Sequence, residues 1–173
     1  MKKIAVVYKS KYGKTKQYAG WIAEALNASL FENKNVKLYQ LNDYDVVIYG
    51  GGLYAGGISG AKFFTKNSFK TLVVFTVGVA DPSISNYTQI LEKVFSTEQL
   101  SKIKVFHLRG GIDYSRLSFA HKAMMAVMKK IIEKKPLAER ESDDIGVLET
   151  YGKNIDFSNK ATIEPLVEYV RTL

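Results

Sequence analysis

The chain contains no cysteine and only two histidines among its 173 residues. These absences exclude disulfide bonds, iron–sulfur clusters, zinc-finger sites and a thiol nucleophile, and they leave few ligands for any other metal centre. No apolar run approaches the roughly 18 residues that a membrane-spanning helix needs. The apolar stretch near the start turns polar at Lys9, too early for a signal-peptide core, so we expect a cytoplasmic protein. Because the chain has no cysteine and few metal ligands, any redox chemistry must come from a bound organic cofactor.

Proline is also scarce, with three residues, and no linker rich in proline, glycine and serine divides the chain. Hydrophobic residues make up 46% of it, which is enough for a sizeable core, so we predict a single domain over residues 1–173. Basic residues outnumber acidic ones by 25 to 17, and the resulting net charge of +8 favours anionic partners. Nucleic acid is not expected among them, because the chain carries no recognition motif and no interleaved exposed aromatic residues.

Short apolar runs alternate with helical periodicity along most of the chain. Strands are predicted at residues 3–8, 44–49, 71–77 and 104–108, and residues 29–32 can add a short fifth strand. Helices are predicted at residues 14–28, 60–66, 84–95, 119–134 and 160–172, whereas the polar segment 136–159 is expected to be irregular. Nearly continuous apolar strands are typical of parallel sheets that are covered on both faces. The expected fold is an α/β three-layer sandwich, with a five-stranded parallel sheet and helices on both faces.

The first loop at the carboxyl edge of the predicted sheet is the strongest functional signal. It runs from a strand directly into a helix and consists of Ser10, Lys11, Tyr12, Gly13, Lys14 and Thr15. Free N–H groups at a helix N-terminus bind phosphate, the two hydroxyls can add donors, and Gly13 permits close approach of the backbone. A Walker-type nucleotide site is not expected, because it requires a glycine where this chain has Tyr8. The alternative explanation is that Ser10 or Thr15 simply caps the helix.

The segment around this loop resembles the phosphate-loop signature of the flavodoxin family. The matching positions are Val6, Val7, Tyr8, Ser10, Gly13, Thr15, Ala19 and Ile22. The order of the predicted elements also resembles the flavodoxin-like fold along nearly the whole chain. The resemblance implies a noncovalent FMN site, in which residues 10–15 hold the 5′-phosphate and two later loops flank the isoalloxazine ring. Flavodoxins usually carry Thr-Gly near Lys11 and Tyr12, so the side-chain contacts of the phosphate are expected to differ here.

Two further loops are the ones that the resemblance places beside the ring. The first is rich in glycine and contributes the predicted cofactor residues Gly52, Leu53, Tyr54, Ala55 and Gly56. In this loop Tyr54 is expected to stack on or flank the flavin. A dinucleotide fingerprint is the competing interpretation of the glycine spacing, but the acidic residue that it requires after the next strand is missing. The second loop contributes Thr76, Val77, Gly78 and Val79, and its continuation at residues 81–83 can equally be only a turn followed by the cap of the next helix.

The helix predicted at residues 119–134 carries an apolar stripe and several lysines. The stripe, from which Met125 departs, consists of Phe119, Ala120, Ala123, Met124, Val127, Met128, Ile131 and Ile132. Its periodicity fits a helix that packs on the sheet. It also fits a basic amphipathic surface, so residues 119–135 are a candidate for peripheral contact with anionic lipid. We expect His107 to be structural and His121 to lie at the surface.

The leading hypothesis is an FMN-binding, flavodoxin-like protein that carries electrons and exchanges them with a redox partner protein or a quinone. The glycine-rich turn after Arg109 and the Met-rich helix are similar to the flavodoxin-type, menaquinone-dependent protoporphyrinogen oxidases. That resemblance implies an alternative, in which an enzyme passes electrons from an anionic tetrapyrrole to a quinone. The carboxylates of the tetrapyrrole are then bound by Arg109, Arg116 and the helix lysines Lys122, Lys129, Lys130, Lys134 and Lys135. No residue is assigned as catalytic, and no bound metal is expected.

Overall fold

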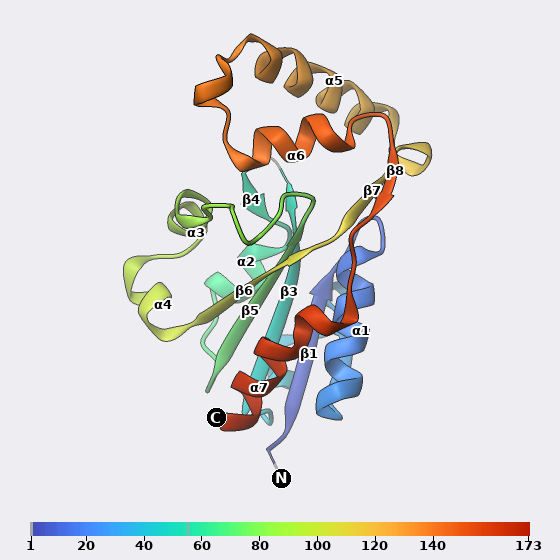
Figure 1. The fold of residues 1–173 in the computed structure, drawn as a ribbon. Coiled ribbons are helices and arrows are strands. Elements are labelled where there is room, and N and C mark those ends of the chain that lie inside the picture. Colours follow the sequence, from blue (N-terminus) through green and yellow to red (C-terminus); the bar gives the residue numbers. More distant parts are fainter. Residues whose placement is uncertain (1, 55) are drawn as a thin grey trace.

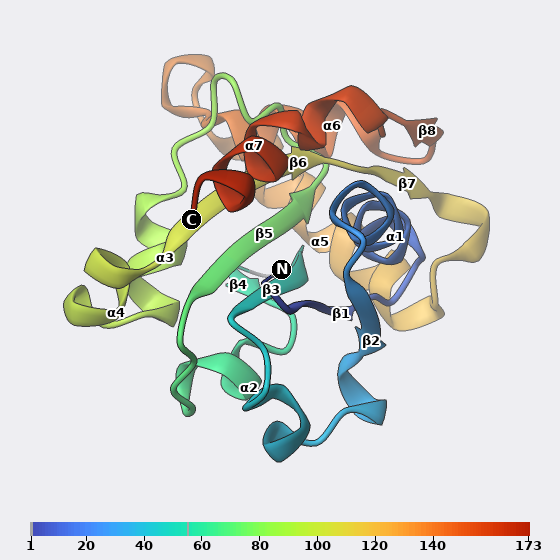
Figure 2. The ribbon, with the colours of Figure 1, turned by 90° about the horizontal axis from the view of Figure 1, so that it is seen from below.

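A central sheet of five parallel strands organises the computed structural model, which describes residues 2–54 and 56–173. The predicted cofactor residue Ala55 lies outside the described residues. The strands run in the order β2-β1-β3-β5-β6 (Figures 1 and 2), with the bounds Ser29–Glu32, Ile4–Lys9, Val46–Tyr54, Leu72–Gly78 and Lys104–Arg109. The two-residue strand β4 (Gly57–Ile58) pairs antiparallel with the end of β3. The predicted α/β fold with a five-stranded parallel sheet is confirmed, including its short strand at 29–32.

Helices cover both faces of the sheet (Figure 2). They are α1 (Lys14–Leu26) and α7 (Glu164–Thr172) on one face, and α2 (Ala61–Thr65), α3 (Thr88–Val94) and α4 (Thr97–Lys102) on the other. Ile22 and Leu166 are fully buried on the first face, and Phe64 is buried on the second. Because successive strand residues point to opposite faces, a sheet covered in this way needs apolar residues along the whole of each central strand.

Two further helices form a cap over the carboxyl ends of the strands (Figure 1). They are α5 (Phe119–Lys134) and α6 (Ser142–Thr150), and the cap is joined to the sheet through an antiparallel pair, β7 (Gly111–Asp113) with β8 (Asn154–Asp156). Leu117, Met125, Ile132 and Val147 form a small core of the cap that is separate from the two cores of the sheet. The prediction that residues 136–159 are irregular is wrong, because α6 and β8 lie within them.

Several element boundaries differ from the predicted ones for local reasons. The helix predicted at 84–95 begins only at Thr88, since the carboxylate of Asp81 accepts hydrogen bonds from the N–H (2.9 Å) and the hydroxyl (2.7 Å) of Ser83 and holds a turn there. The glycine-rich segment is not a loop up to Tyr54, because β3 continues to that residue. The helix α4 lies in a segment for which no helix was predicted.

Contrary to the prediction, the apolar stripe of α5 does not pack on the sheet. Phe119 is 89% exposed, and Val127 and Ile131 are each 57% exposed, whereas Met125 from outside the stripe is buried. The helix therefore presents one apolar face to the cap core and a second one to solvent. Within residues 2–54 and 56–173, no helix combines the length and the apolar character needed to cross a bilayer.

Candidate functional site

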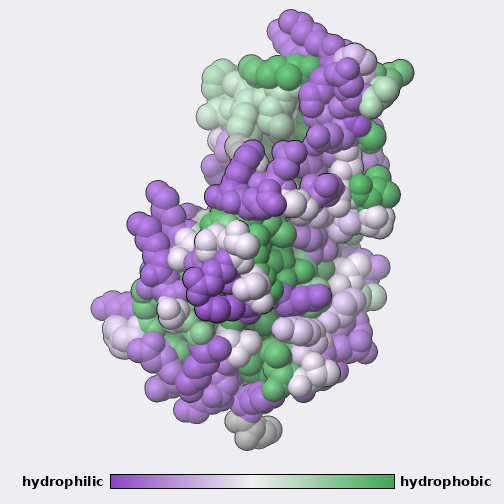
Figure 3. All heavy atoms as spheres, turned by 90° about the vertical axis from the view of Figure 1, so that its left-hand side faces the viewer, coloured by the Kyte–Doolittle hydropathy of each residue, from purple (hydrophilic) through white to green (hydrophobic). Residues whose placement is uncertain are grey.

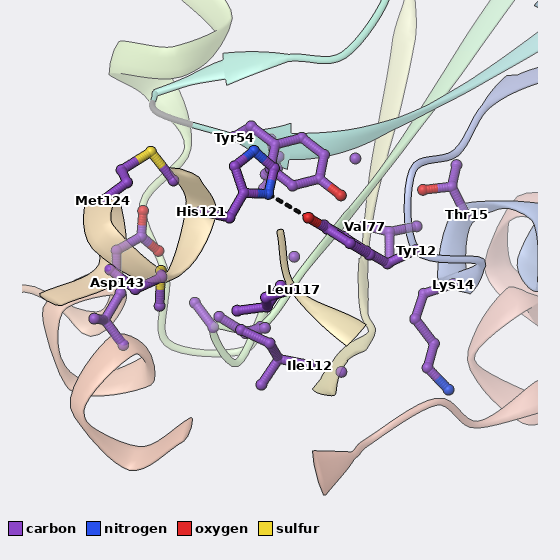
Figure 4. Close-up of a pocket in the computed structure, with 18 of the residues that line it drawn as sticks. Tyr12, Lys14, Thr15, Tyr54, Val77, Ile112, Leu117, His121, Met124 and Asp143 are labelled. Atoms are coloured by element: carbon purple, nitrogen blue, oxygen red, sulfur yellow. Dashed lines mark hydrogen bonds between the residues drawn. The ribbon is translucent and has the colours of Figure 1, made fainter. Parts of the chain in front are cut away.

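The strands β1 and β3 are neighbours, and the chain leaves them toward opposite edges of the sheet. β1 continues through α1 to β2 on one side, and β3 continues to β5 on the other. Ligands of open α/β sheets bind at such a point, outside the carboxyl ends of the strands. Here Lys9, at the end of β1, pairs with Gly51 of β3. A cavity of about 220 Å³ opens beyond these ends and is roofed by the cap (Figure 4).

The three loops that the sequence predicted meet in this cavity. Its lining includes Ser10, Tyr12, Lys14, Thr15, Gly52, Leu53, Tyr54, Gly56, Val77, Gly78 and Val79. Three other predicted residues, Lys11, Gly13 and Thr76, are not among the described residues that line it. Lys11 is exposed, and Thr76 is fully buried with its hydroxyl 2.6 Å from Nδ1 of His107. The site is thus built largely from the predicted segments, although not from every predicted side chain.

One end of the cavity is formed by the start of α1. Gly13 is the N-cap residue with a φ of 98°, a conformation that favours glycine, and its N–H donates to the Ser10 hydroxyl at 3.0 Å. The backbone N–H groups of the first turn have no partner within the helix, and the helix dipole is positive there. Thr15 is only 4% exposed and lines the cavity (Figure 4), and Ser10 is a lining residue as well. This end is therefore suited to binding a phosphate group.

The neighbouring part of the cavity has a mostly apolar lining. A Cβ atom at Gly52 would lie 2.7 Å from the Tyr54 ring and 3.5 Å from Oγ1 of Thr15, so glycine keeps open the space between the strand and the phosphate end. A Cβ atom at Gly78 would lie 3.0 Å from Leu53, so the ends of β3 and β5 pack closely beneath it. Burial, together with the nearby Tyr12, raises the pKa of Tyr54, which stays neutral. The geometry fits a ligand that carries a phosphate at one end and a planar group at the other.

His121 of α5, expected at the surface, lies in the cavity instead. Its Nδ1 is 2.5 Å from the Tyr12 hydroxyl, its Nε2 is 3.0 Å from Nζ of Lys11, and its ring stacks on Tyr54 with 6.1 Å between centroids (Figure 4). Because a lysine ammonium group only donates, Nε2 accepts, and Nδ1–H donates to the Tyr12 oxygen. The hydrogen of the Tyr12 hydroxyl is then free to bond to a ligand.

Arg109, the predicted carboxylate receptor, is engaged by the protein itself. Its NH2 lies 3.1 Å from a carboxylate oxygen of Glu149, and its NH1 lies 3.8 Å from one of Asp81. Its Nε donates to the carbonyl of Val79 at 3.0 Å, and its guanidinium group stacks 3.7 Å from the centre of the Phe157 ring. Arg109 therefore ties the loop after β5 to α6 and holds the cap in place. Arg116, also predicted as a receptor, is exposed, and neither it nor any of the predicted helix lysines is among the described residues that line the cavity.

A family model described as a flavodoxin domain matches residues 5–138, which is most of the chain. The chain belongs to the flavodoxin domain family. Among solved structures, this flavodoxin domain is similar to a putative flavoprotein from Bacteroides eggerthii (18% identity over 78% of this chain and 100% of that one, TM-score 0.47). It is also similar to oxidised Flavodoxin 2 from Bacillus cereus (21% identity over 62% of this chain and 84% of that one, TM-score 0.46). A third similar structure is a flavoprotein in complex with FMN from Lactobacillus acidophilus (14% identity over 63% of this chain and 93% of that one, TM-score 0.44). No curated protein matches the chain.

Sequence reasoning missed the part of the flavodoxin-domain cavity that the cap and its approach provide. The additional lining residues are Ala80, Ile90, Gly111, Ile112, Asp113, Leu117, His121, Met124, Met125, Met128, Asp143 and Val147. The methionines and the departure of Met125 from the stripe were a usable signal, since methionine is common at adaptable binding surfaces. Asp143 gave no such signal. Burial, and then repulsion from Glu141 and Asp144, raises the pKa of its carboxyl group.

Proposed function

We propose that this flavodoxin domain binds FMN noncovalently and carries electrons in redox reactions. The observation that carries the proposal is the continuity of the α1 N-terminus, with its buried Thr15, and an apolar cavity flanked by Tyr54. The first-turn N–H groups and the hydroxyl of Thr15 hold the phosphate, and the ring lies between Tyr54 and residues 77–79. When bound, FMN supplies the electron-transfer chemistry, whereas the protein orients it and keeps water from it.

A flavin titration followed by fluorescence quenching tests the cofactor assignment. We expect FMN to bind and riboflavin, which lacks the phosphate, to bind more weakly. Thr15→Val removes the hydroxyl at nearly constant volume and is expected to weaken FMN binding about tenfold, the effect of losing one hydrogen bond to a charged group, with no change for riboflavin. The matched control is Thr97→Val, at the exposed first residue of α4, which leaves both affinities unchanged.

Two results of this titration would contradict the proposal. Equal affinities for FMN and riboflavin would mean that the α1 N-terminus does not hold the phosphate. Failure of either flavin to bind would remove the proposed function altogether.

The partners that we propose for the flavin are a redox protein or a quinone, and the net charge of +8 favours an acidic protein or an anionic surface. An enzyme that binds an anionic tetrapyrrole is not favoured, because the guanidinium group of Arg109 is already paired with Glu149 and Asp81.

We also propose that the outer face of α5 contacts an anionic membrane surface. This face comprises the exposed apolar residues Phe119, Val127 and Ile131 and the exposed lysines Lys122, Lys130 and Lys134, and Leu137 follows it with 80% exposure. Apolar and hydrophilic side chains lie next to one another on the surface of the cap (Figure 3). Lysines around an exposed apolar ridge are complementary to acidic headgroups over an apolar layer.

A further inference from the structure

Three hydrogen-bonded side chains lead from the surface of the protein into the cavity. Lys11 is exposed, and its Nζ lies 3.0 Å from Nε2 of His121. On the other side of the same imidazole ring, Nδ1 lies 2.5 Å from the hydroxyl oxygen of Tyr12, which is half-buried and lines the cavity (Figure 4). One imidazole ring therefore connects a lysine that exchanges protons with water to a hydroxyl group inside the site.

The elements that supply these side chains fix the position of the imidazole ring. Lys11 and Tyr12 belong to the loop between β1 and α1. His121 lies in the first turn of α5, and its backbone N–H donates to the hydroxyl of the N-cap residue Ser118 at 3.3 Å. The imidazole ring also stacks on Tyr54, with 28° between the planes. Contacts on its face and at its edge thus give both ring nitrogens defined partners.

The hydrogen bonds of this series all run in one direction, toward the cavity. Because the ammonium group of Lys11 only donates, Nε2 of His121 accepts, and Nδ1–H donates to the Tyr12 oxygen. The hydroxyl hydrogen of Tyr12 is then left for a group in the cavity. A neutral imidazole accepts a proton at one nitrogen and releases one from the other, so it can pass protons between its two neighbours.

Two charged residues of the cavity are less suited to this transfer. Nζ of Lys14 lies 2.5 Å from a carboxylate oxygen of Asp156, and the ion pair retains its hydrogens. The hydroxyl of Ser115 donates to Asp113 and lowers the pKa of its carboxyl group, so that Asp113 has no proton to give at neutral pH. A phenol and a neutral imidazole, by contrast, pass a proton on without leaving an unpaired charge in a mostly apolar space.

We propose that Lys11, His121 and Tyr12 form a proton path between solvent and the bound flavin, with Tyr12 as the residue that delivers the proton. The inference rests on the proposed function, because the acceptor is the FMN ring in this cavity. When the flavin takes one electron from its redox partner protein, it takes up one proton at ring nitrogen N5.

The proton transfer along this path balances at every atom. The O–H bond of Tyr12 breaks as the N–H bond of the flavin forms, and the Tyr12 oxygen regains a proton from Nδ1 of His121. Nε2 of the imidazole gains a proton from Lys11, which takes one from water. Oxidation of the flavin sends the proton outward along the same atoms and restores the first arrangement of the imidazole.

Flash reduction of the FMN-saturated protein tests the path, because a photoexcited deazaflavin delivers one electron before the proton arrives. The absorbance change that follows measures the rate of proton uptake by the flavin. Tyr12→Phe removes the last hydroxyl, and His121→Gln keeps a donor and an acceptor but does not shuttle protons. Each should slow proton uptake at least about tenfold, a modest share of what a positioned acid contributes. Lys11→Arg should also slow it, because a guanidinium group donates without releasing its proton.

The matched control is Tyr114→Phe, which removes a hydroxyl group from a residue packed against the cap core. Tyr114 is not among the described residues that line the cavity, so the rate should stay within about twofold of the wild type. A second measurement needs no flavin. Nitrogen NMR of the protein with isotope-labelled histidine shows only two imidazole rings, and His107→Gln identifies the signals of His121. At neutral pH we expect Nδ1 of His121 to carry the hydrogen and Nε2 to lack it.

The outcomes separate this inference from the proposed function. Unchanged proton uptake in Tyr12→Phe and His121→Gln would overturn the inference and leave the FMN assignment standing. The opposite tautomer of His121, or a wild-type flavin that takes up no proton after the flash, would do the same. Failure of FMN to bind would remove the proposed function and with it the acceptor of the path, a result that the flavin titration shows before any flash.

Discussion

At the scale of single residues, His107 is a polar side chain beside the site that supports the shape of the site. Its Nδ1 lies 2.6 Å from the Thr76 hydroxyl, and its ring stacks on Tyr87 with 3.7 Å between centroids and 13° between planes. The ring joins β6 to β5 and to the segment before α3, directly behind the loop at residues 77–79. Burial lowers the pKa of His107 from 6.5 to about 4, so the imidazole is neutral at neutral pH.

This lowered pKa predicts an acid-sensitive contribution to stability. Because the unfolded chain takes up the proton at a higher pH than the folded protein, the contribution is complete above pH 6.5, decreases as the pH falls, and is lost by about pH 4. His107→Gln removes this titration. Urea denaturation between pH 7.5 and 4 should show that the wild type loses on the order of 2 kcal/mol more than the variant. Parallel pH curves for the two proteins would contradict the prediction.

The residues of the cavity differ in how far the sequence could predict them. Thr15 follows β1 and Tyr54 ends β3, and the apolar runs of both strands are unmistakable, so the place of these residues at the carboxyl edge of the sheet could be predicted. Asp143 lies in a polar segment without clear periodicity. Its helix is fixed by contacts that composition does not reveal, namely the capping box of Glu141 with Asp144 and the 2.8 Å ion pair of Asp144 with Lys135. The acidic group of the cap therefore had to come from the structure.

At the scale of elements, α5 is amphipathic in an unusual sense, because it has two apolar faces. Met125 and Ile132 pack into the cap core, while Phe119 and Ile131 face solvent. Periodicity predicted the helix correctly but not its orientation, since it cannot distinguish packing on a sheet from packing on α6. Packing in the core does not explain the apolar residues of α5 that face solvent, and the explanation proposed above is contact with lipid.

The lipid contact predicts a specific vesicle-binding behaviour. The protein should sediment with vesicles that contain phosphatidylglycerol, and binding should weaken at high salt, because each lysine near an anionic surface contributes about 1 kcal/mol that salt screens. Replacing Phe119 and Ile131 together by serine should reduce binding at least about tenfold. The control is Ile84→Ser, which changes an apolar residue of 69% exposure outside the cap. Equal binding to phosphatidylcholine vesicles, or unchanged binding of the double variant, would contradict the proposal.

At the scale of the whole molecule, the sheet and its two helical layers were predictable, because they follow from the alternation of apolar strands and periodic helices. The cap could not be predicted, because it has a small core of its own that is built on a few close contacts. One of them is that of Gly146, where a Cβ atom would lie 3.2 Å from Cα of Ala80. Charge is also distributed unevenly along the chain. The basic excess belongs to the chain before residue 136, whereas acidic residues outnumber basic ones after it and include those of α6 above the cavity.

This charge distribution leads to a prediction about the bound flavin. Reduced FMN is anionic, so a chain with a net charge of +8 should stabilise it and give a less negative reduction potential than that of an acidic flavodoxin. Each 1.4 kcal/mol of such stabilisation corresponds to about 30 mV for a two-electron couple. Spectroelectrochemical titration measures the potential directly. Salt screens the distant charges of the whole molecule more strongly than the nearby carboxylates of α6, so the potential should become more negative as ionic strength rises. A potential as low as that of an acidic flavodoxin, and independent of salt, would mean that the local acidic residues outweigh the net charge.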